Sequence, residues 1–290
     1  MSRLSSSPYW VVAAAVVCVS TGSILVRMAE APALTVALYR IGLASAILSP
    51  FAWRAGLRAW PALPGRQAAA LAGAGVALGL HFGTWIASLS YTTVAASVLL
   101  VNTAPLFTLA FARVFLGEGV RPATLLAMTA ALLGAVAIAA GDWRGGAASL
   151  RGTGLALAGA VTLSLYHVIG RGLRHALPLN AYVLAVWTGA TLTLALLALL
   201  WGAPLWGFSP RSLLCFLALA MVPTLGGHGL VNIALRLLPA PTVGLFLLGE
   251  PVGAGLLAYL LLGETPALPT LAGGALVVAA LVAVVVVERP

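Results

Sequence analysis

Residues 99–118 read LLVNTAPLFTLAFARVFLGE, and residues 245–264 read LFLLGEPVGAGLLAYLLLGE. The two stretches agree at six positions, and each pair lies 146 residues apart in a chain of 290. The shared proline and the closing Gly-Glu are the most informative, because the chain holds only 6 acidic residues. The sequence is therefore two related units laid end to end. The pairs are Leu99 and Leu245, Pro105 and Pro251, Ala112 and Ala258, Leu116 and Leu262, Gly117 and Gly263, and Glu118 and Glu264.

Further matches extend the repeat over both halves. The chain has only 4 His, so a His pair in register is informative. With the boundary near Gly145-Gly146, the units are residues 1–145 and 146–290. A doubled, very apolar chain is typical of secondary transporters. These further pairs are Ser20 and Ser164, Arg27 and Arg171, Gly79 and Gly226, His81 and His228, and Ala87 and Ala234.

Composition places the chain in a lipid bilayer. It is 62% hydrophobic and 7% charged, with a mean hydropathy of +1.09, whereas a soluble domain carries about 25% charged residues. Apolar runs of roughly 20 residues predict transmembrane helices. We expect an all-α integral membrane protein with ten transmembrane helices. They are residues 9–29, 33–52, 68–88, 93–115, 122–140, 153–172, 180–201, 212–235, 241–262 and 267–287.

The number of helices fixes how the halves are related. Each half holds five of the ten expected helices, and five is odd. The second half must then enter the membrane in the opposite orientation. The chain is predicted to be two inverted five-helix repeats, related by a pseudo-two-fold axis in the membrane plane.

The positive charge indicates the orientation. All 15 basic residues are arginine, and they are spread over the predicted loops, so we expect no nucleic-acid partner. The positive-inside rule explains them better and predicts that both termini are cytoplasmic. The cytoplasmic side receives Arg3, Arg54, Arg58, Arg66, Arg113, Arg121, Arg171, Arg174, Arg236 and Arg289, and the outer side receives Arg27, Arg144, Arg151 and Arg211.

Two polar stripes lie within predicted helices. Thr224, His228 and Asn232 are spaced i, i+4, i+8, and His81 and Trp85 begin the matching stripe of the first half. Polar residues at membrane depth usually face a cavity or another helix. As repeat mates, the two His are predicted to lie on opposite walls of one cavity. The alternative is that each His packs between helices and bonds a carbonyl or hydroxyl.

Prolines interrupt two repeat-related helices. Asn102 precedes Pro105 by three residues, and Glu250 precedes Pro251 directly. A proline inside a helix frees the carbonyl four residues back, and paired interruptions are the best sequence pointer to a transporter site. A packing bend without ligand contact is the alternative reading.

Glu250 is the only acid deep within a predicted helix. An ionised carboxylate at the bilayer centre costs on the order of 2.5–3.5 kcal/mol on insertion scales. Three roles stay open: binding a substrate's amino group, carrying a proton, or bonding within the bundle as a neutral acid. Arg27 and Arg171 are expected to anchor helix ends. Arg40 is expected to snorkel to the interface or pair with a helix carbonyl.

The pattern of the half-ends resembles a known family. Each half closes with Gly-Glu, then a proline (Pro122, and Pro266 with Pro269), then a last helix. With ten helices, the stretch ALYRIGLASAIL around Arg40 and the Glu250-Pro251 pair, the chain resembles the EamA-type branch of the drug/metabolite transporter (DMT) superfamily. Within it, the chain most resembles the YddG-type exporters of aromatic and other neutral amino acids. The resemblance implies export across the bacterial inner membrane.

Other functions fit the residues less well. An intramembrane enzyme needs paired Asp, HExxH or GxSxG, and the sequence has none of these, so we expect no catalysis. A sugar phosphate, nucleotide sugar or cationic drug remains an alternative substrate, and a non-transporting assembly protein an alternative role. We expect alternating access with an amino-acid substrate, proton coupling through Glu250 as an open role, and neither cofactor nor metal. The expected substrate-binding residues are His81, Trp85, Asn102, Tyr166, Trp187, His228, Asn232 and Glu250, with helix breaks at Pro105 and Pro251.

The arginine distribution makes the topology testable. A cysteine at position 146 lies in the loop from Asp142 to Arg151, which is predicted to be external. An impermeant thiol reagent should label it in intact cells. Labelling only after permeabilisation would show that the number of spans is wrong.

Overall fold

The computed structural model describes residues 8–116, 122–142, 146–173, 177–237, 243, 246–247 and 249–287. All regular structure in this part of the chain is helical. The elements are α1 (Pro8–Ser20), α2 (Gly22–Met28), α3 (Ala33–Ala59), η1 (Trp60–Ala62), α4 (Gly65–Ser88), α5 (Val94–Val101), α6 (Ala104–Leu116), α7 (Pro122–Asp142), α8 (Ala147–Leu173), α9 (Leu179–Leu200), α10 (Pro210–Leu219), η3 (Ala220–His228), α11 (Gly229–Leu237), α13 (Gly249–Leu262) and α14 (Leu268–Val287).

Most of these helices have the length and composition of membrane-spanning helices. Within the described ranges, seven helices are long and apolar enough to cross a membrane, namely Tyr9–Met28, Ala33–Ala62, Gly65–Ser88, Val94–Phe115, Ser149–Gly170, Leu179–Leu200 and Pro210–Val231. Three shorter apolar helices, Leu125–Ile138, Gly249–Leu262 and Leu268–Ala283, lie in the stretches predicted as the fifth, ninth and tenth spans.

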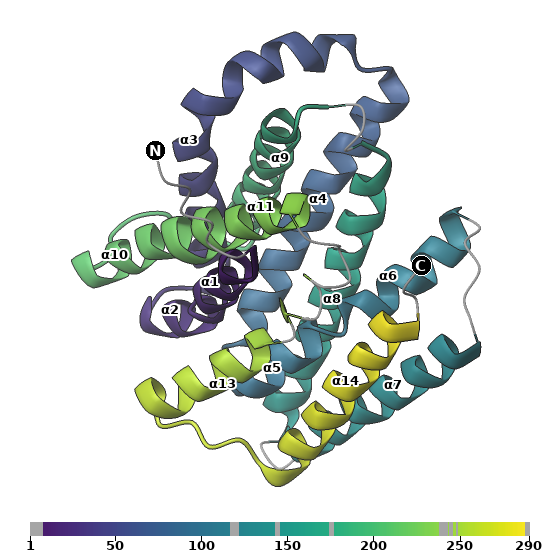
Figure 1. The fold of residues 1–290 in the computed structure, drawn as a ribbon. Coiled ribbons are helices and arrows are strands. Elements are labelled where there is room, and N and C mark those ends of the chain that lie inside the picture. Colours follow the sequence, from purple (N-terminus) through teal and green to yellow (C-terminus); the bar gives the residue numbers. More distant parts are fainter. Residues whose placement is uncertain are drawn as a thin grey trace, which may run out of the picture.

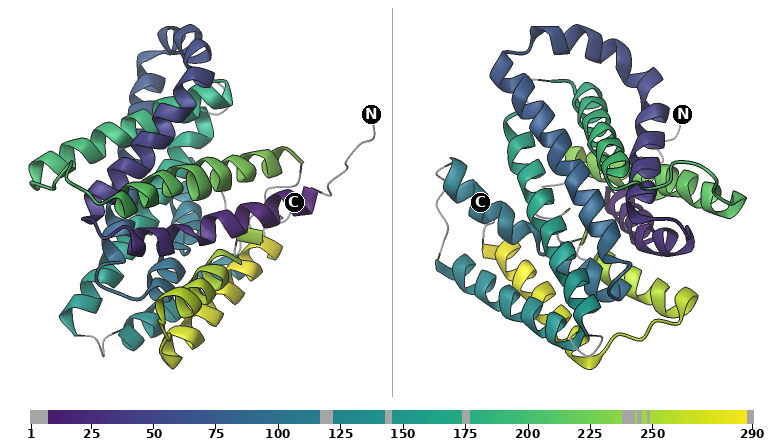
Figure 2. Two further views of the ribbon diagram at one scale, coloured as in Figure 1. Left: turned by 90° about the vertical axis from the view of Figure 1, so that its left-hand side faces the viewer. Right: turned by 180° about the vertical axis from the view of Figure 1, so that it is seen from behind.

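The helices form two packed groups that meet along α8. In Figure 1, α3, α4, α8 and α9 stand together, and α7 lies beside α14 at the lower right. The same neighbours recur in the two views of Figure 2. The most extensive packing joins α4 to α8, α7 to α14, α3 to α9 and α4 to α9. The consecutive helical segments α10, η3 and α11 follow one another in space, and η3 and α11 pack against α1 (Figure 1).

The interior is packed with apolar side chains, and much of the surface is apolar too. One core cluster joins α2, α3, α4 and α9, and a second joins α5, α7, α8 and α14. Large apolar side chains such as Leu126, Val114 and Leu260 are exposed. Lipid tails are as apolar as leucine, so such an outer face is stable in a bilayer.

Three of the predicted spans are not regular α-helices. The first is divided at Thr21, whose Oγ1 donates to Cys18 O at 2.7 Å. The fourth is divided at Asn102 and Thr103, just before Pro105. Proline has no N–H to donate to a carbonyl of the preceding turn. The eighth contains η3, a π-helical segment with Pro223 inside. Thr hydroxyls bend helices by bonding to preceding carbonyls, and proline removes a donor, so these residues explain the irregularities.

Glycines of α4 allow a close contact with α9 of the second half. The sequence places Gly75, Gly79 and Gly83 four residues apart on α4. A β-carbon on Gly75 would lie 2.9 Å from the Cα of Gly189 on α9, and one on Gly79 would lie 2.8 Å from Thr193 Cβ. Small residues at such crossings let two backbones approach closely.

This crossing predicts a position-specific loss of stability. Gly75→Ala should lower the free energy of unfolding by about 1–3 kcal/mol, because the added methyl group has no room. Gly73→Ala is the matched control on the same helix, since its methyl group would meet only Ile169 Cδ1 at 4.0 Å. Thermal unfolding of the two purified proteins in one detergent measures the difference. Equal unfolding midpoints would contradict the close crossing.

Candidate functional site

Arg40 is the eighth residue of α3 and is almost completely buried, with 3% of its surface exposed. Its Nε donates to Thr224 Oγ1 at 2.9 Å. The sequence reading gave Arg40 an interfacial or carbonyl-bound position. The structure instead turns its side chain into the protein, toward helices of both halves.

Aromatic rings of α4 flank the guanidinium. The Cζ of Arg40 lies 4.5 Å from the centre of the Phe82 ring and 5.4 Å from that of Trp85. Both distances are within the range of a cation–π interaction, which partly replaces the water that a charged group loses on burial. His81 stacks parallel to Trp85 with ring centres 6.1 Å apart.

The π-helical segment η3 positions the partner of Arg40. Thr224 Oγ1 donates to Leu219 O, five residues back, at 2.8 Å, and it accepts from Arg40 at the same time. Pro223 cannot donate a backbone hydrogen bond, which favours a local departure from α-helical geometry. π-Helical turns occur often at functional sites.

The start of α13 brings the acid of the second half to the same region. Glu250 lies in the first turn of α13 and is half-buried. The amide of Asn102, which caps the C-terminus of α5, donates to Val98 O at 2.9 Å and is close enough to hydrogen-bond Glu250. Ser20 Oγ, at the end of α1, contacts Glu250 O at 3.4 Å. Three interrupted helices therefore meet at Glu250.

The two buried charges interact without forming an ion pair. Arg40 and Glu250 are close enough for their charges to attract each other. Among the described side chains, neither of the two has an oppositely charged partner within ion-pair distance. The central site therefore offers separate positive and negative groups.

Histidines from three helices surround the guanidinium. His81, His167 and His228 each lie within electrostatic range of one another, and His81 and His228 also of Arg40. His81 is buried, and its Nδ1 lies 2.9 Å from Gly159 O on α8. His228 is exposed although it lies mid-helix. The repeat mates are thus near each other but differ in access to solvent.

The other expected site residues lie at varying distances from this centre. Tyr166 is half-buried on α8 with its ring beside that of His167. Trp187 of α9 is buried in the protein core, and its backbone oxygen accepts a hydrogen bond from Thr191 Oγ1. Pro105 lies in the first turn of α6 and Pro251 in the first turn of α13. The backbone of Asn232 belongs to α11, but its side chain lies outside the described residues.

Sequence reasoning left out three contributors to this centre: Arg40, Phe82 and His167. An arginine within a membrane helix is itself a signal, because such residues are usually functional. Phe82 carried no usable signal, since aromatic residues occur in most of the predicted spans.

A second polar group, here named the clasp, joins the halves at one end of the helices. Arg27 Nη2 lies 3.0 Å from Glu264 Oε1 and donates to Thr92 O at 2.8 Å. Glu264 Oε2 accepts from Val94 N, the first residue of α5, at 2.8 Å. A carboxylate at a helix N-terminus is stabilised by the helix dipole. The clasp therefore ties α2 and α5 to the end of α13.

The clasp also explains the Gly-Glu of the second half. Gly263 has φ +68°, a left-handed conformation that favours glycine just after a helix. It ends α13 and turns the chain so that Glu264 reaches α5. The first-half counterparts, Gly117 and Glu118, lie outside the described residues.

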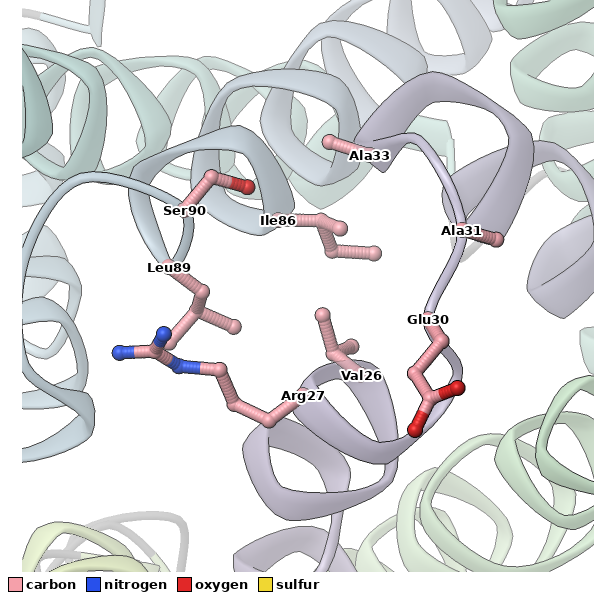
Figure 3. A pocket seen from close by; sticks show the side chains of 8 residues that line it. All are labelled: Val26, Arg27, Glu30, Ala31, Ala33, Ile86, Leu89 and Ser90. Atoms are coloured by element: carbon pink, nitrogen blue, oxygen red, sulfur yellow. The ribbon is translucent and has the colours of Figure 1, made fainter. Parts of the chain in front are cut away.

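A half-open pocket of about 180 Å³ lies beside the clasp (Figure 3). Apolar side chains line most of it, with Arg27 and Glu30 at its edge. Figure 3 shows Arg27 extending toward Leu89, away from Glu30. Glu30 instead pairs with Arg211 at 3.1 Å, and both side chains are largely exposed. The pocket contains none of the expected site residues.

Metal binding finds no support in the described part of the chain. No group of three or more His, Cys, Asp or Glu side chains there is arranged to hold a metal ion.

Comparison with known proteins identifies relatives of the chain. The EamA-like transporter family matches it twice, over residues 6–140 and 150–286. One crystal structure, described only as that of a protein, has a TM-score of 0.67 and 21% sequence identity, covering 98% of this chain and 99% of that one. At this identity the likeness concerns the fold alone. No curated protein matches the chain.

The clasp predicts a measurable coupling between Arg27 and Glu264. Their side chains are only 32% and 20% exposed and share further hydrogen bonds, so a double-mutant cycle with Arg27→Gln and Glu264→Gln should give about 1–2 kcal/mol. The control cycle uses Arg211 and Glu30, which are 59% and 63% exposed. It should give about 0.5 kcal/mol or less. Thermal or denaturant unfolding measures both, and equal couplings would contradict a structural role for the clasp.

Proposed function

We propose that this chain, which belongs to the EamA-like transporter family, exports aromatic and other neutral amino acids across the bacterial inner membrane, as its resemblance to the YddG-type exporters implies. Membership of the family makes it a membrane transporter of the DMT superfamily. The observation that carries the proposal is the central site. There, one buried base and one acid stand apart among aromatic rings and imidazoles, where interrupted helices meet.

Helix packing supports ten spans arranged as two inverted repeats. If the two halves are exchanged, α7 takes the place of α14 and α3 takes the place of α9. The members of both pairs pack against each other. The same exchange maps the contact of α4 with α8 onto that of η3 with α1, and both contacts exist. A pseudo-two-fold axis in the membrane plane generates this pattern.

Unequal packing of equivalent pairs supports alternating access. The contact of α4 with α9 is more extensive than its counterpart, which α10 and η3 make with α3. Two identical arrangements would make these contacts alike, so the halves adopt different conformations around the same centre. A rocking motion that interchanges these conformations exposes the site to each side in turn.

The clasp supports a conformation closed toward the outside. The arginine distribution assigns the end of the helices near Arg27 and Glu30 to the external face. The ion pair of Arg27 with Glu264 holds α2 and the end of α13 together at this end. A central site closed at this end would open to the cytoplasm, which is where an exporter collects its substrate.

The site residues divide into two chemical groups. Trp85, Tyr166 and Trp187 provide aromatic surface for a bulky side chain. His81, Asn102, His228 and Asn232 provide hydrogen bonds, and Glu250 provides a negative charge for the substrate's ammonium group. Glu250 is also the group that would exchange a proton if transport is coupled to one.

Arg40 raises the question of a phosphorylated substrate, since guanidinium groups bind phosphate well. Glu250 weakens the attraction of Arg40 for an anion, because its carboxylate attracts the same guanidinium. A phosphate monoester carries about two negative charges at pH 7 and would be repelled by Glu250. A zwitterion matches both groups, which favours an amino acid.

Transport by the purified chain tests the proposal. Proteoliposomes that contain the protein should take up labelled phenylalanine or leucine faster than empty liposomes. In cells, its expression should raise resistance to toxic amino-acid analogues. Movement of a sugar phosphate or a cationic drug, with no amino acid of a broad panel moved, would contradict the proposed substrate.

The same assay tests Glu250. Glu250→Gln keeps the shape of the side chain and removes its charge, so uptake should fall severalfold or lose its dependence on pH. The matched control is Glu30→Gln, which removes an exposed acid away from the centre and should behave as the wild type. A Glu250→Gln protein with wild-type rates and pH profile would show that Glu250 has a structural role only.

A further inference from the structure

The hydrogen bonds of Arg40 are incomplete. A guanidinium has five N–H donors and no acceptor. Nε is used by Thr224, whereas the buried Nη1 has no hydrogen-bond partner. A buried, charged donor without a partner is strongly destabilising, more so than an exposed one.

A second buried donor without a partner adjoins the first. Nε1 of Trp85 is buried and has no hydrogen-bond partner, and the ring that carries it lies against the Arg40 guanidinium. Two side chains from α3 and α4 thus offer N–H groups in one region. What both lack is an acceptor, and an anionic oxygen is the acceptor that satisfies a charged and a neutral donor together.

The neighbouring backbone leaves room on this side of the guanidinium. Gly22, the first residue of α2, is near both groups: a β-carbon there would lie 3.6 Å from Arg40 Nη1 and 3.7 Å from Trp85 Cη2. The interruption at Thr21 thus places a residue without a side chain beside Arg40 Nη1 and the edge of the Trp85 ring. None of the described side chains supplies a hydrogen-bond acceptor to Arg40 Nη1 or Trp85 Nε1.

We propose that Arg40 is the anchor for the carboxylate of the transported amino acid, with Trp85 Nε1 as a second donor and Glu250 facing the ammonium group. This assignment rests on the proposed function. A guanidinium matches the two oxygens of a carboxylate in a planar, bidentate geometry. The opposite charge of Glu250, within electrostatic range but unpaired with Arg40, matches the other end of the zwitterion. The substrate class is therefore molecules that carry both charges.

Competition in proteoliposomes tests which charges the site reads. Uptake of labelled phenylalanine is measured against four unlabelled compounds: phenylalanine, phenylalaninamide, phenethylamine and 3-phenylpropionate. The last three lack the carboxylate charge, the whole carboxylate and the ammonium group, respectively. Only phenylalanine should compete strongly with the wild type. In Arg40→Gln, its half-inhibitory concentration should rise about ten- to hundredfold, approaching that of the amide.

Three variants separate recognition from folding. Arg54→Gln removes an exposed arginine from the same helix and should compete as the wild type does. Arg40→Lys keeps the charge but not the planar geometry, so its loss should be intermediate. Trp85→Phe keeps an aromatic ring beside Arg40 and removes the N–H donor together with part of the indole ring. It should weaken phenylalanine severalfold and leave phenethylamine unchanged, even if Arg40→Gln proves unstable in thermal unfolding.

The outcomes distinguish this assignment from the function on which it rests. A wild-type protein that carries no amino acid overturns both. A wild-type protein that carries phenylalanine but is inhibited equally by the amide and the amine overturns the carboxylate assignment alone. So does a folded Arg40→Gln or Trp85→Phe protein that discriminates among the four compounds as the wild type does.

Discussion

The central constraint on this molecule is a guanidinium held away from water inside an apolar helix bundle. Arg40 is buried, and a charge at such depth needs neighbours that replace its hydration. Thr224 accepts one hydrogen bond, and the faces of Phe82 and Trp85 lie against the charge. These neighbours belong to η3 and α4, so satisfying one side chain fixes three helices around a common point.

The interruptions of the helices serve the same centre. Glu250, Asn102 and Ser20 each lie where a helix begins or ends, and Glu250 contacts the other two. A continuous helix uses its polar backbone groups internally, whereas an interrupted one can turn polar groups toward a ligand. At the clasp, Glu264 uses the N-terminus of α5 in the same way. Polar contacts between the halves thus occur at helix ends as well as within helices, where Arg40 bonds to Thr224 and His81 contacts Gly159 O.

The apolar runs of the sequence predicted the positions of the helices. A helix in lipid needs a long apolar segment, whichever other helices it packs against. Prolines predicted the interruption at Pro105, since the missing N–H is local. The interruption at Thr21 was not predictable, because most hydroxyl residues leave a helix intact. The position of Arg40 depends on Thr224, 184 residues away in sequence, which no single-helix pattern reveals. The contacts of Glu264 were not predictable for the same reason: its partners Arg27 and Val94 belong to the other half.

A structure of the protein with a bound amino acid tests the central claim most directly, because the claim is geometric. We expect the ligand's carboxylate within hydrogen-bonding distance of Arg40 Nη1 and Trp85 Nε1, and its ammonium group beside Glu250. We also expect its side chain against the aromatic residues of α4 and α8. An amino acid bound elsewhere, with Arg40 still bonded only to Thr224, would contradict the account.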